Sequence, residues 1–249
     1  MSRRWRRIAV LAIPVGALCL LAVLAVEVLL ARRGPMLARQ PLELDGRVGG
    51  GPGPVLRAVW LGDSTAAGVG VDEPTEALAH VVSAGLGRPV DLTVLAVSGD
   101  RVGDVVADQL TAAAAVDPDL VFVSVGANDV THLTSRSDFR SQYRTVLDRL
   151  RDGAEVVVLG VPDMGAVPRL AQPLRAIAGL RGRQLDEVVR DVAGEAGATY
   201  VPIAAATGPA FRAEPEVLFA ADDYHPSAAG YRLWAAAVLA ELPDLASTG

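Results

Sequence analysis

The sequence contains no lysine, since all 23 of its basic residues are arginine. We interpret this as the compositional bias of a GC-rich genome and assign it no function. Cysteine is almost absent too: Cys19 is the only one, and it lies within an apolar N-terminal run. A single thiol excludes a disulfide framework and argues against a redox role. Leu18 stands where a lipid-attachment site has a small residue, so we expect Cys19 to be buried in the membrane.

Patterns of metal ligands are also missing. His80, His132 and His225 are the only histidines, and no grouping of His, Cys or Glu has the spacing of a metal site. We therefore expect no metal and no cofactor. Residues 1–33 carry a net charge of +5, so the rest of the chain carries −11 of the total of −6. An acidic body argues against nucleic-acid binding and against electrostatic docking on anionic lipid.

A long apolar run lies near the N-terminus between clusters of arginine. Residues 8–26 contain no charged side chain, and Glu27 follows them. About 20 such residues can span a bilayer as a helix, and the heavier positive charge before the run predicts a cytoplasmic N-terminus. The alternative is a cleaved signal peptide, whose apolar core is usually only about 7–15 residues long. Both interpretations put the rest of the chain outside the cytoplasm, tethered to the cell membrane or, after cleavage, secreted.

The sequence divides into three parts. Residues 1–33 form the basic flank and the predicted transmembrane anchor. Residues 34–54 are rich in Gly and Pro, a composition that blocks regular structure and predicts a linker. Residues 55–249 are long enough to form one domain with a full core.

Within this domain, short apolar runs alternate with longer amphipathic ones, which predicts a parallel sheet covered by helices on both faces. The expected strands are residues 55–61, 90–97, 120–125, 155–161 and 199–203. The expected helices are residues 75–86, 102–115, 137–151, 173–196 (interrupted near Gly179 and Gly182) and 226–242.

Three short motifs follow the first three expected strands. They are Gly62-Asp63-Ser64, Ser98-Gly99-Asp100 and Gly126-Ala127-Asn128-Asp129. Because ligands bind beyond the carboxyl ends of the strands in such sheets, the three motifs are expected to meet at one edge.

Residue types in these motifs suit acyl transfer. Ser64 is a candidate nucleophile, Asn128 a candidate side-chain donor to an oxyanion, and Gly99 a candidate backbone donor. Each also has a plain structural interpretation: Ser64 as a helix cap, Asn128 as a turn residue bonded to local backbone, and Gly99 as a turn that requires positive φ.

His225 is the best candidate for a base. It precedes a helix and lies three residues after Asp222, so one turn can hold both side chains and let the carboxylate fix the imidazole tautomer. His80 lies within an expected helix, and His132 in a loop after the third strand. We expect a structural or surface role for His80 and a solvated position for His132.

Four segments together resemble the SGNH hydrolases, also called GDSL esterases or lipases. They are Val59-Trp60-Leu61-Gly62-Asp63-Ser64, Val97-Ser98-Gly99, Val125-Gly126-Ala127-Asn128-Asp129 and Asp222-Asp223-Tyr224-His225-Pro226-Ser227. The resemblance covers about residues 55–242. One departure is Thr65, where the family name has Leu, and we expect it to have little effect on the mechanism.

The resemblance implies a three-layer α/β/α flavodoxin-like fold with five parallel strands. It also implies a serine esterase or lipase with Ser64 as nucleophile, His225 as base and Asp222 as its orienting group. The Ser64 and Gly99 backbone N–H groups and the Asn128 side chain would form the oxyanion hole. The implied substrates are small-molecule, lipid or glycan esters.

Two alternatives are weaker. The motif around Ser64 is close to the nucleophile elbow of α/β-hydrolases, but too little chain precedes it to supply their upstream oxyanion donor. A binding module that holds an anion at the Ser64 turn would leave Asn128 and the Asp222–His225 pair without a role. Residues 162–170 and 207–221 are expected as loops that shape the substrate pocket, with Met164, Phe211 and Phe219 as candidate lining residues.

Overall fold

A six-stranded sheet forms the centre of the protein. The computed structural model describes residues 18, 21–31, 33, 42–151 and 153–242. Within this part of the chain the strand order is β1-β3-β2-β4-β5-β6, and every neighbouring pair is parallel except β1 and β3. The strands are β1 (Gly46–Val48), β2 (Leu56–Gly62), β3 (Val90–Val94), β4 (Leu120–Ser124), β5 (Glu155–Leu159) and β6 (Thr199–Val201).

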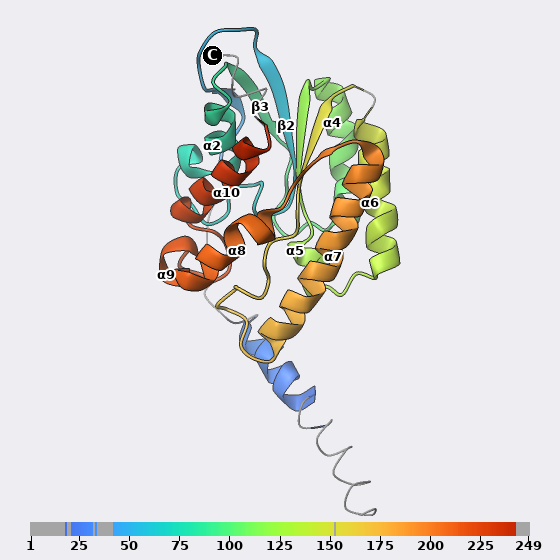
Figure 1. The fold of residues 1–249 in the computed structure, drawn as a ribbon, viewed down its shortest axis with the longest axis vertical. Coiled ribbons are helices and arrows are strands. Elements are labelled where there is room, and N and C mark those ends of the chain that lie inside the picture. Colours follow the sequence, from blue (N-terminus) through green and yellow to red (C-terminus); the bar gives the residue numbers. More distant parts are fainter. Residues whose placement is uncertain (1–17, 19–20, 32, 34–41, 152, 243–249) are drawn as a thin grey trace, which may run out of the picture.

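Helices cover both faces of this sheet (Figure 1). One layer contains α2 (Leu78–Gly85), α8 (Ile203–Ala213), α9 (Pro215–Leu218) and α10 (Ala228–Ala240). The other contains α4 (Leu110–Val116), α6 (Arg136–Leu150) and α7 (Leu174–Ala196). The short elements are η1 (Pro74–Glu76), α3 (Val102–Asp104), the π-helical turn η2 (Val105–Gln109) and α5 (Ala127–Thr131). The expected three-layer α/β/α arrangement is confirmed.

The core lies on both sides of the central strands. All five residues of β4 are buried, as are six of the seven in β2. Between these strands the Trp60 and Phe122 rings stack with centroids 4.4 Å apart. A strand that is apolar on both faces is stable only where helices cover both faces, so the central position of β2 and β4 follows from their sequence.

The expectation of five strands, all parallel, is wrong by one strand. Residues 46–48, within the expected linker, form β1 and pair antiparallel with β3 through Gly46–Leu92 and Val48–Val90. Local sequence hides this strand, because three residues that begin with Gly46 and precede Gly49 have no visible periodicity. The neighbouring strand supplies their hydrogen-bond partners.

Two further segments differ from the sequence-based expectations. Helix α7 is continuous through Gly179 and Gly182. A Cβ at Gly179 would meet the Gly165 backbone, and one at Gly182 would meet Met164, so these glycines allow close packing instead of ending the helix. The segment 207–221, expected as a loop, is largely helical in α8 and α9.

Much of the predicted transmembrane anchor lies outside the described residues. Residues 21–31 are helical, and this segment is called the N-terminal helix below. Among the described residues, no helix is both long enough and apolar enough to cross a bilayer. Membrane insertion of residues 8–31 therefore stays a prediction.

Candidate active site

A continuous hydrogen-bonded chain joins the three predicted catalytic residues. The Nε2 atom of His225 lies 3.0 Å from Ser64 Oγ, and its Nδ1 atom lies 2.6 Å from Asp222 Oδ2. Ser64 follows β2, whereas Asp222 and His225 lie in the turn before α10. Ser64 and His225 are 161 positions apart in the sequence, and the fold brings them together at the edge of the sheet where β2 ends.

Asp222 is held by its own turn. Its Oδ1 atom accepts hydrogen bonds from the backbone N–H groups of Tyr224 and His225, both at 3.0 Å, and Asp222 is only 2% exposed. Burial acts to raise the pKa of Asp222, but the hydrogen bonds from His225 and Tyr224 outweigh burial and hold that pKa below its ordinary value. Asp222 therefore stays charged beside the ring that it orients.

Ser64 lies on a tight turn that begins at Gly62, a position that only glycine can occupy. Gly62 has φ of +142°, and a Cβ there would collide with the Ser124 backbone. The Asp63 N–H donates to Ser124 O at 3.0 Å, and the Val69 N–H donates to Ser64 O at 2.9 Å. The turn is therefore bound to the end of β4, and this fixes Ser64 at the edge of the sheet.

Asp63 is a buried carboxylate directly before the candidate nucleophile. Its Oδ1 atom accepts from the Thr65 N–H at 3.0 Å and from the Thr65 hydroxyl at 2.9 Å. Burial raises the pKa of Asp63 to about 6, although the two bonds from Thr65 act to lower it. Thr65, the departure from the family name, is a partner of Asp63 here, and its hydroxyl also lies 2.9 Å from Ser124 Oγ.

Gln109 supports the same turn, and the sequence analysis did not identify it. Its Oε1 accepts from the Gly62 N–H at 2.8 Å, while its Nε2 donates to Gly62 O at 2.9 Å and to Asp100 Oδ2 at 2.8 Å. Gln109 is the last residue of η2, a single turn of π-helix, and such turns often occur at functional sites. Its only sequence signal is an amide among small apolar residues, which does not specify a partner.

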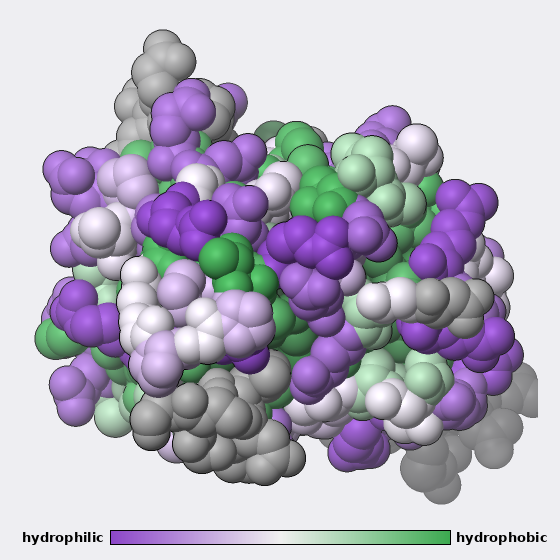
Figure 2. Space-filling view, turned by 90° about the horizontal axis from the view of Figure 1, so that it is seen from above, coloured by the Kyte–Doolittle hydropathy of each residue, from purple (hydrophilic) through white to green (hydrophobic). Residues whose placement is uncertain are grey.

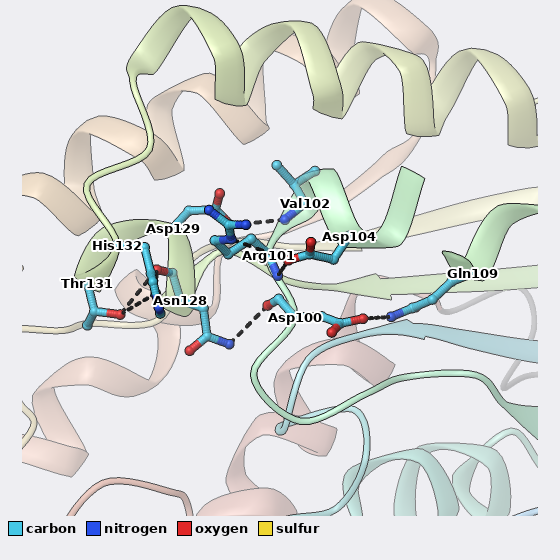
Figure 3. Close-up of polar contacts among 9 residues, drawn as sticks. All are labelled: Asp100, Arg101, Val102, Asp104, Gln109, Asn128, Asp129, Thr131 and His132. Carbon is cyan, nitrogen blue, oxygen red and sulfur yellow. Dashed lines mark hydrogen bonds and ion pairs between the residues drawn. The ribbon is translucent and has the colours of Figure 1, made fainter. Parts of the chain in front are cut away.

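Asn128 contacts Asp100, in the loop that precedes α3 (Figure 3). Its Nδ2 atom donates to Asp100 O at 2.9 Å, directly after Gly99, whose φ is +96°. An amide carries two N–H donors, so the bond to Asp100 orients the group and leaves one donor for another acceptor. The structure thus brings Asn128 and the Gly99 loop together, as the sequence predicted. Asp129, the next residue, is fully buried and accepts from the Val102 N–H at 3.1 Å.

The other two histidines lie apart from the hydrogen-bonded chain. His132 is exposed at the end of α5, and its Nδ1 lies 2.9 Å from Asn128 O. His80 contacts Leu44 O at 2.9 Å through Nε2. His225 is thus the histidine that contacts Ser64, in agreement with the sequence analysis.

A small apolar cavity of about 40 Å³ opens beside Ser64 and His225. Met164, Phe211 and Phe219, the three residues expected at the pocket, contribute to its wall together with Val167 and Trp234. Phe211 and Phe219 pack edge to face with centroids 4.9 Å apart. The cavity suits a short apolar group next to the serine hydroxyl.

The raised pKa of Asp63 predicts a specific pH dependence of stability. Between about pH 4 and pH 6 the folded chain keeps the Asp63 proton that the unfolded chain has lost, so the contribution of Asp63 to the unfolding free energy falls as pH rises. Asp63→Asn keeps an oxygen acceptor for Thr65 and has no proton to lose. We expect urea unfolding to show the variant gaining stability relative to the wild type across this window.

The control for this experiment is Ser98→Ala, which removes an exposed hydroxyl and no titratable group. Its stability difference from the wild type should stay constant over the same pH range. A constant difference for Asp63→Asn as well would contradict the assigned protonation of Asp63.

Comparison with known proteins agrees with this geometry. Residues 60–233 match the GDSL-like lipase/acylhydrolase family, and this range includes Ser64, Gly99, Asn128, Asp222 and His225. The chain is also 34% identical over 221 residues to the GDSL-like esterase Rv1075c of Mycobacterium tuberculosis, an alignment that covers 82% of this chain and 70% of the relative.

Solved structures share the fold. The lipase/acylhydrolase of Enterococcus faecalis superimposes with a TM-score of 0.58 at 22% identity, over 76% of this chain and 96% of that one. A variant of Axe2, an acetyl xylan esterase of Geobacillus stearothermophilus, gives 0.59 at 20% identity, over 78% and 96% of the two chains. This chain belongs to the GDSL-like lipase/acylhydrolase family and is a serine ester hydrolase.

Proposed function

We propose that the protein hydrolyses carboxylic esters through an acyl-serine intermediate on Ser64. The observation that carries the proposal is the contact of Ser64 Oγ with His225 Nε2 at 3.0 Å, with Asp222 on the opposite ring nitrogen. A serine hydroxyl becomes a useful nucleophile only when a base takes its proton, and this arrangement supplies that base. A binding module would have no use for this contact.

The reaction follows in two halves. Ser64 Oγ attacks the ester carbonyl carbon while its proton passes to His225 Nε2, and the tetrahedral intermediate then expels the alcohol, which takes that proton. Water next gives a proton to His225 and attacks the acyl-serine, and the proton returns to Ser64 as the carboxylic acid leaves. Asp222, charged throughout, stabilises the imidazolium in both halves.

The negative oxygen of each tetrahedral intermediate needs fixed donors. We assign this role to the backbone N–H groups of Ser64 and Gly99 and to the Asn128 side chain. The bond from Asn128 to Asp100 O supports the assignment. It uses one amide proton to hold the side chain against the Gly99 loop before substrate arrives, and it leaves the second amide proton for the oxyanion. Donors that need no reorganisation are the ones that stabilise a transition state most.

We propose small-molecule, lipid or glycan esters as substrates. The small cavity beside Ser64 favours a short apolar group on one side of the ester bond. One structural neighbour is named an acetyl xylan esterase and the relative from Mycobacterium tuberculosis an esterase, and both descriptions are compatible with ester cleavage here.

We also propose that residues 8–31 tether the catalytic domain to the cell membrane, with the N-terminus in the cytoplasm and the domain outside it. The support is the uncharged run 8–26 between arginine clusters. Cleavage of the segment as a signal peptide would give a secreted enzyme.

The covalent step predicts selective labelling of one serine. A fluorophosphonate probe should label the wild-type protein at Ser64, and Ser64→Ala should abolish the label, as read by peptide mass spectrometry. Ser98→Ala, which changes another serine at the same edge of the sheet, should label normally.

His225→Ala should be nearly inactive in ester hydrolysis. An equal loss of activity in His132→Ala would mean that the wrong histidine is assigned.

Asn128→Ala should lower kcat by about 10²–10³ with little change in KM, because an oxyanion donor acts mainly in the transition state. Loss of the bond to Asp100 O should cost only about 1 kcal/mol of stability, so the variant should fold. Thr145→Ala on α6, which also loses one side-chain bond to a backbone carbonyl and lies outside both cavities, is the matched control and should keep its kcat. A folded Asn128→Ala enzyme with near-normal kcat would remove Asn128 from the site.

The tether can be tested in intact cells. Added protease should degrade the domain and spare a short N-terminal fragment, as seen with antibodies against each end, while a cytoplasmic marker stays intact. Full protection of the domain would contradict the proposed topology.

A further inference from the structure

A second cavity lies beside the active site, and the N-terminal helix forms one of its walls. It is a groove of about 350 Å³, several times larger than the cavity at Ser64. Val28 and Ala31 line it from the N-terminal helix, and Leu133, Leu174 and Ile177 line it from the segment after α5 and from α7. The groove therefore has largely aliphatic walls, which suit an apolar chain.

The N-terminal helix is fixed against the domain by two polar contacts. Glu27, only 8% exposed, accepts through Oε2 from the Leu174 N–H at 2.9 Å, at the first residue of α7. A carboxylate is favourable there because the first N–H groups of a helix lack partners within the helix. Arg169 donates through Nε to Ala31 O at 2.7 Å. Figure 1 shows the N-terminal helix, in blue, below the start of α7.

The groove adjoins the catalytic residues. Tyr224 lines both the groove and the cavity at Ser64, and its ring packs edge to face on His225 with centroids 5.1 Å apart. Arg169, in the groove wall, donates through Nη1 to Asp222 O at 3.4 Å. Val130 and Thr131 extend the wall along α5, the helix that contains Asn128.

We propose that this groove binds the apolar chain of an amphiphilic ester whose carbonyl lies at Ser64, and that the N-terminal helix is a wall of the substrate site. The inference rests on the proposed ester hydrolysis and names its substrate class. The Ser64 cavity then holds the short arm of the ester, and the groove holds the long one. The long arm belongs either to the acid or to the alcohol, and both present the same aliphatic surface.

The surroundings of the groove support an amphiphile as substrate. Leu133 is 70% exposed at its edge and Ile177 is 44% exposed, and the N-terminal helix has further exposed apolar side chains, including Leu29 and Leu30. The uncharged run 8–26 ends directly before Glu27, the residue that docks on α7. The predicted anchor would thus bring the groove to the membrane surface, where such esters accumulate. At the opposite end of the molecule, hydrophilic and apolar residues are interspersed (Figure 2).

The test fills the groove from each wall in the full chain. Ile177→Trp fills it from α7 and Val28→Trp from the N-terminal helix. The matched controls are Leu180→Trp and Leu29→Trp, which are exposed on the same two helices and outside the groove lining. p-Nitrophenyl esters from acetate to dodecanoate vary the acid, and alkyl acetates from ethyl to dodecyl vary the alcohol, all below their micelle concentrations.

We expect kcat/KM of the wild type to rise with chain length in one of the two series, which identifies the arm in the groove. Both groove variants should lose about tenfold on the longest ester, because a few methylenes lose their apolar contacts, and should stay within about twofold on the shortest. The controls should match the wild type. Cleavage of short esters without any dependence on chain length, or equal losses in variants and controls, would overturn the groove assignment alone. Absence of cleavage in every series would overturn the proposed ester hydrolysis itself.

Discussion

The close approach of Gly62 to the end of β4 is the constraint on which the active site depends. Because a side chain at position 62 would collide with the Ser124 backbone, β2 can end in a sharp turn against its neighbour only with glycine there. Gln109 holds both backbone groups of Gly62, and the Val97 N–H donates to Gly62 O at 3.1 Å. The same few bonds therefore fix the Ser64 turn and, through Val97 and Asp100, the loop that contains Gly99.

The pKa values of buried carboxylates at this edge of the sheet are shifted in opposite directions by their surroundings. Asp222 receives three hydrogen bonds from its own turn and stays charged, as the orienting group of a histidine base must. Asp63 and Asp129 are equally buried, and in both cases burial raises the pKa above the ordinary value. Asp222 therefore keeps its negative charge to lower pH than Asp63 or Asp129, and it is the carboxylate that contacts His225.

The N-terminal helix links the proposed membrane tether to the proposed substrate site. Glu27 interrupts an apolar segment, and a charge in such a segment is costly unless it has a partner. The first N–H group of α7 is that partner, so the charge that ends the apolar run also docks it on the domain. Because the N-terminal helix would form both the end of the tether and a wall of the groove, the position of the enzyme at the membrane would be coupled to the ester that it selects.

The sequence by itself determined the five parallel strands and the main helices between them, and it selected Ser64, Asn128, Asp222 and His225 as candidate site residues, because hydrophobic periodicity and short motifs are local properties. Strand β1, the unbroken course of α7 and the role of Gln109 were decided only by tertiary structure. In each case the partner lies far along the chain: β3 for residues 46–48, Gly165 and Met164 for the glycines of α7, and Gly62 for Gln109. The groove is the extreme case, since the N-terminal helix and α7 are more than a hundred residues apart, and no local pattern can specify a cavity that exists only where such segments meet.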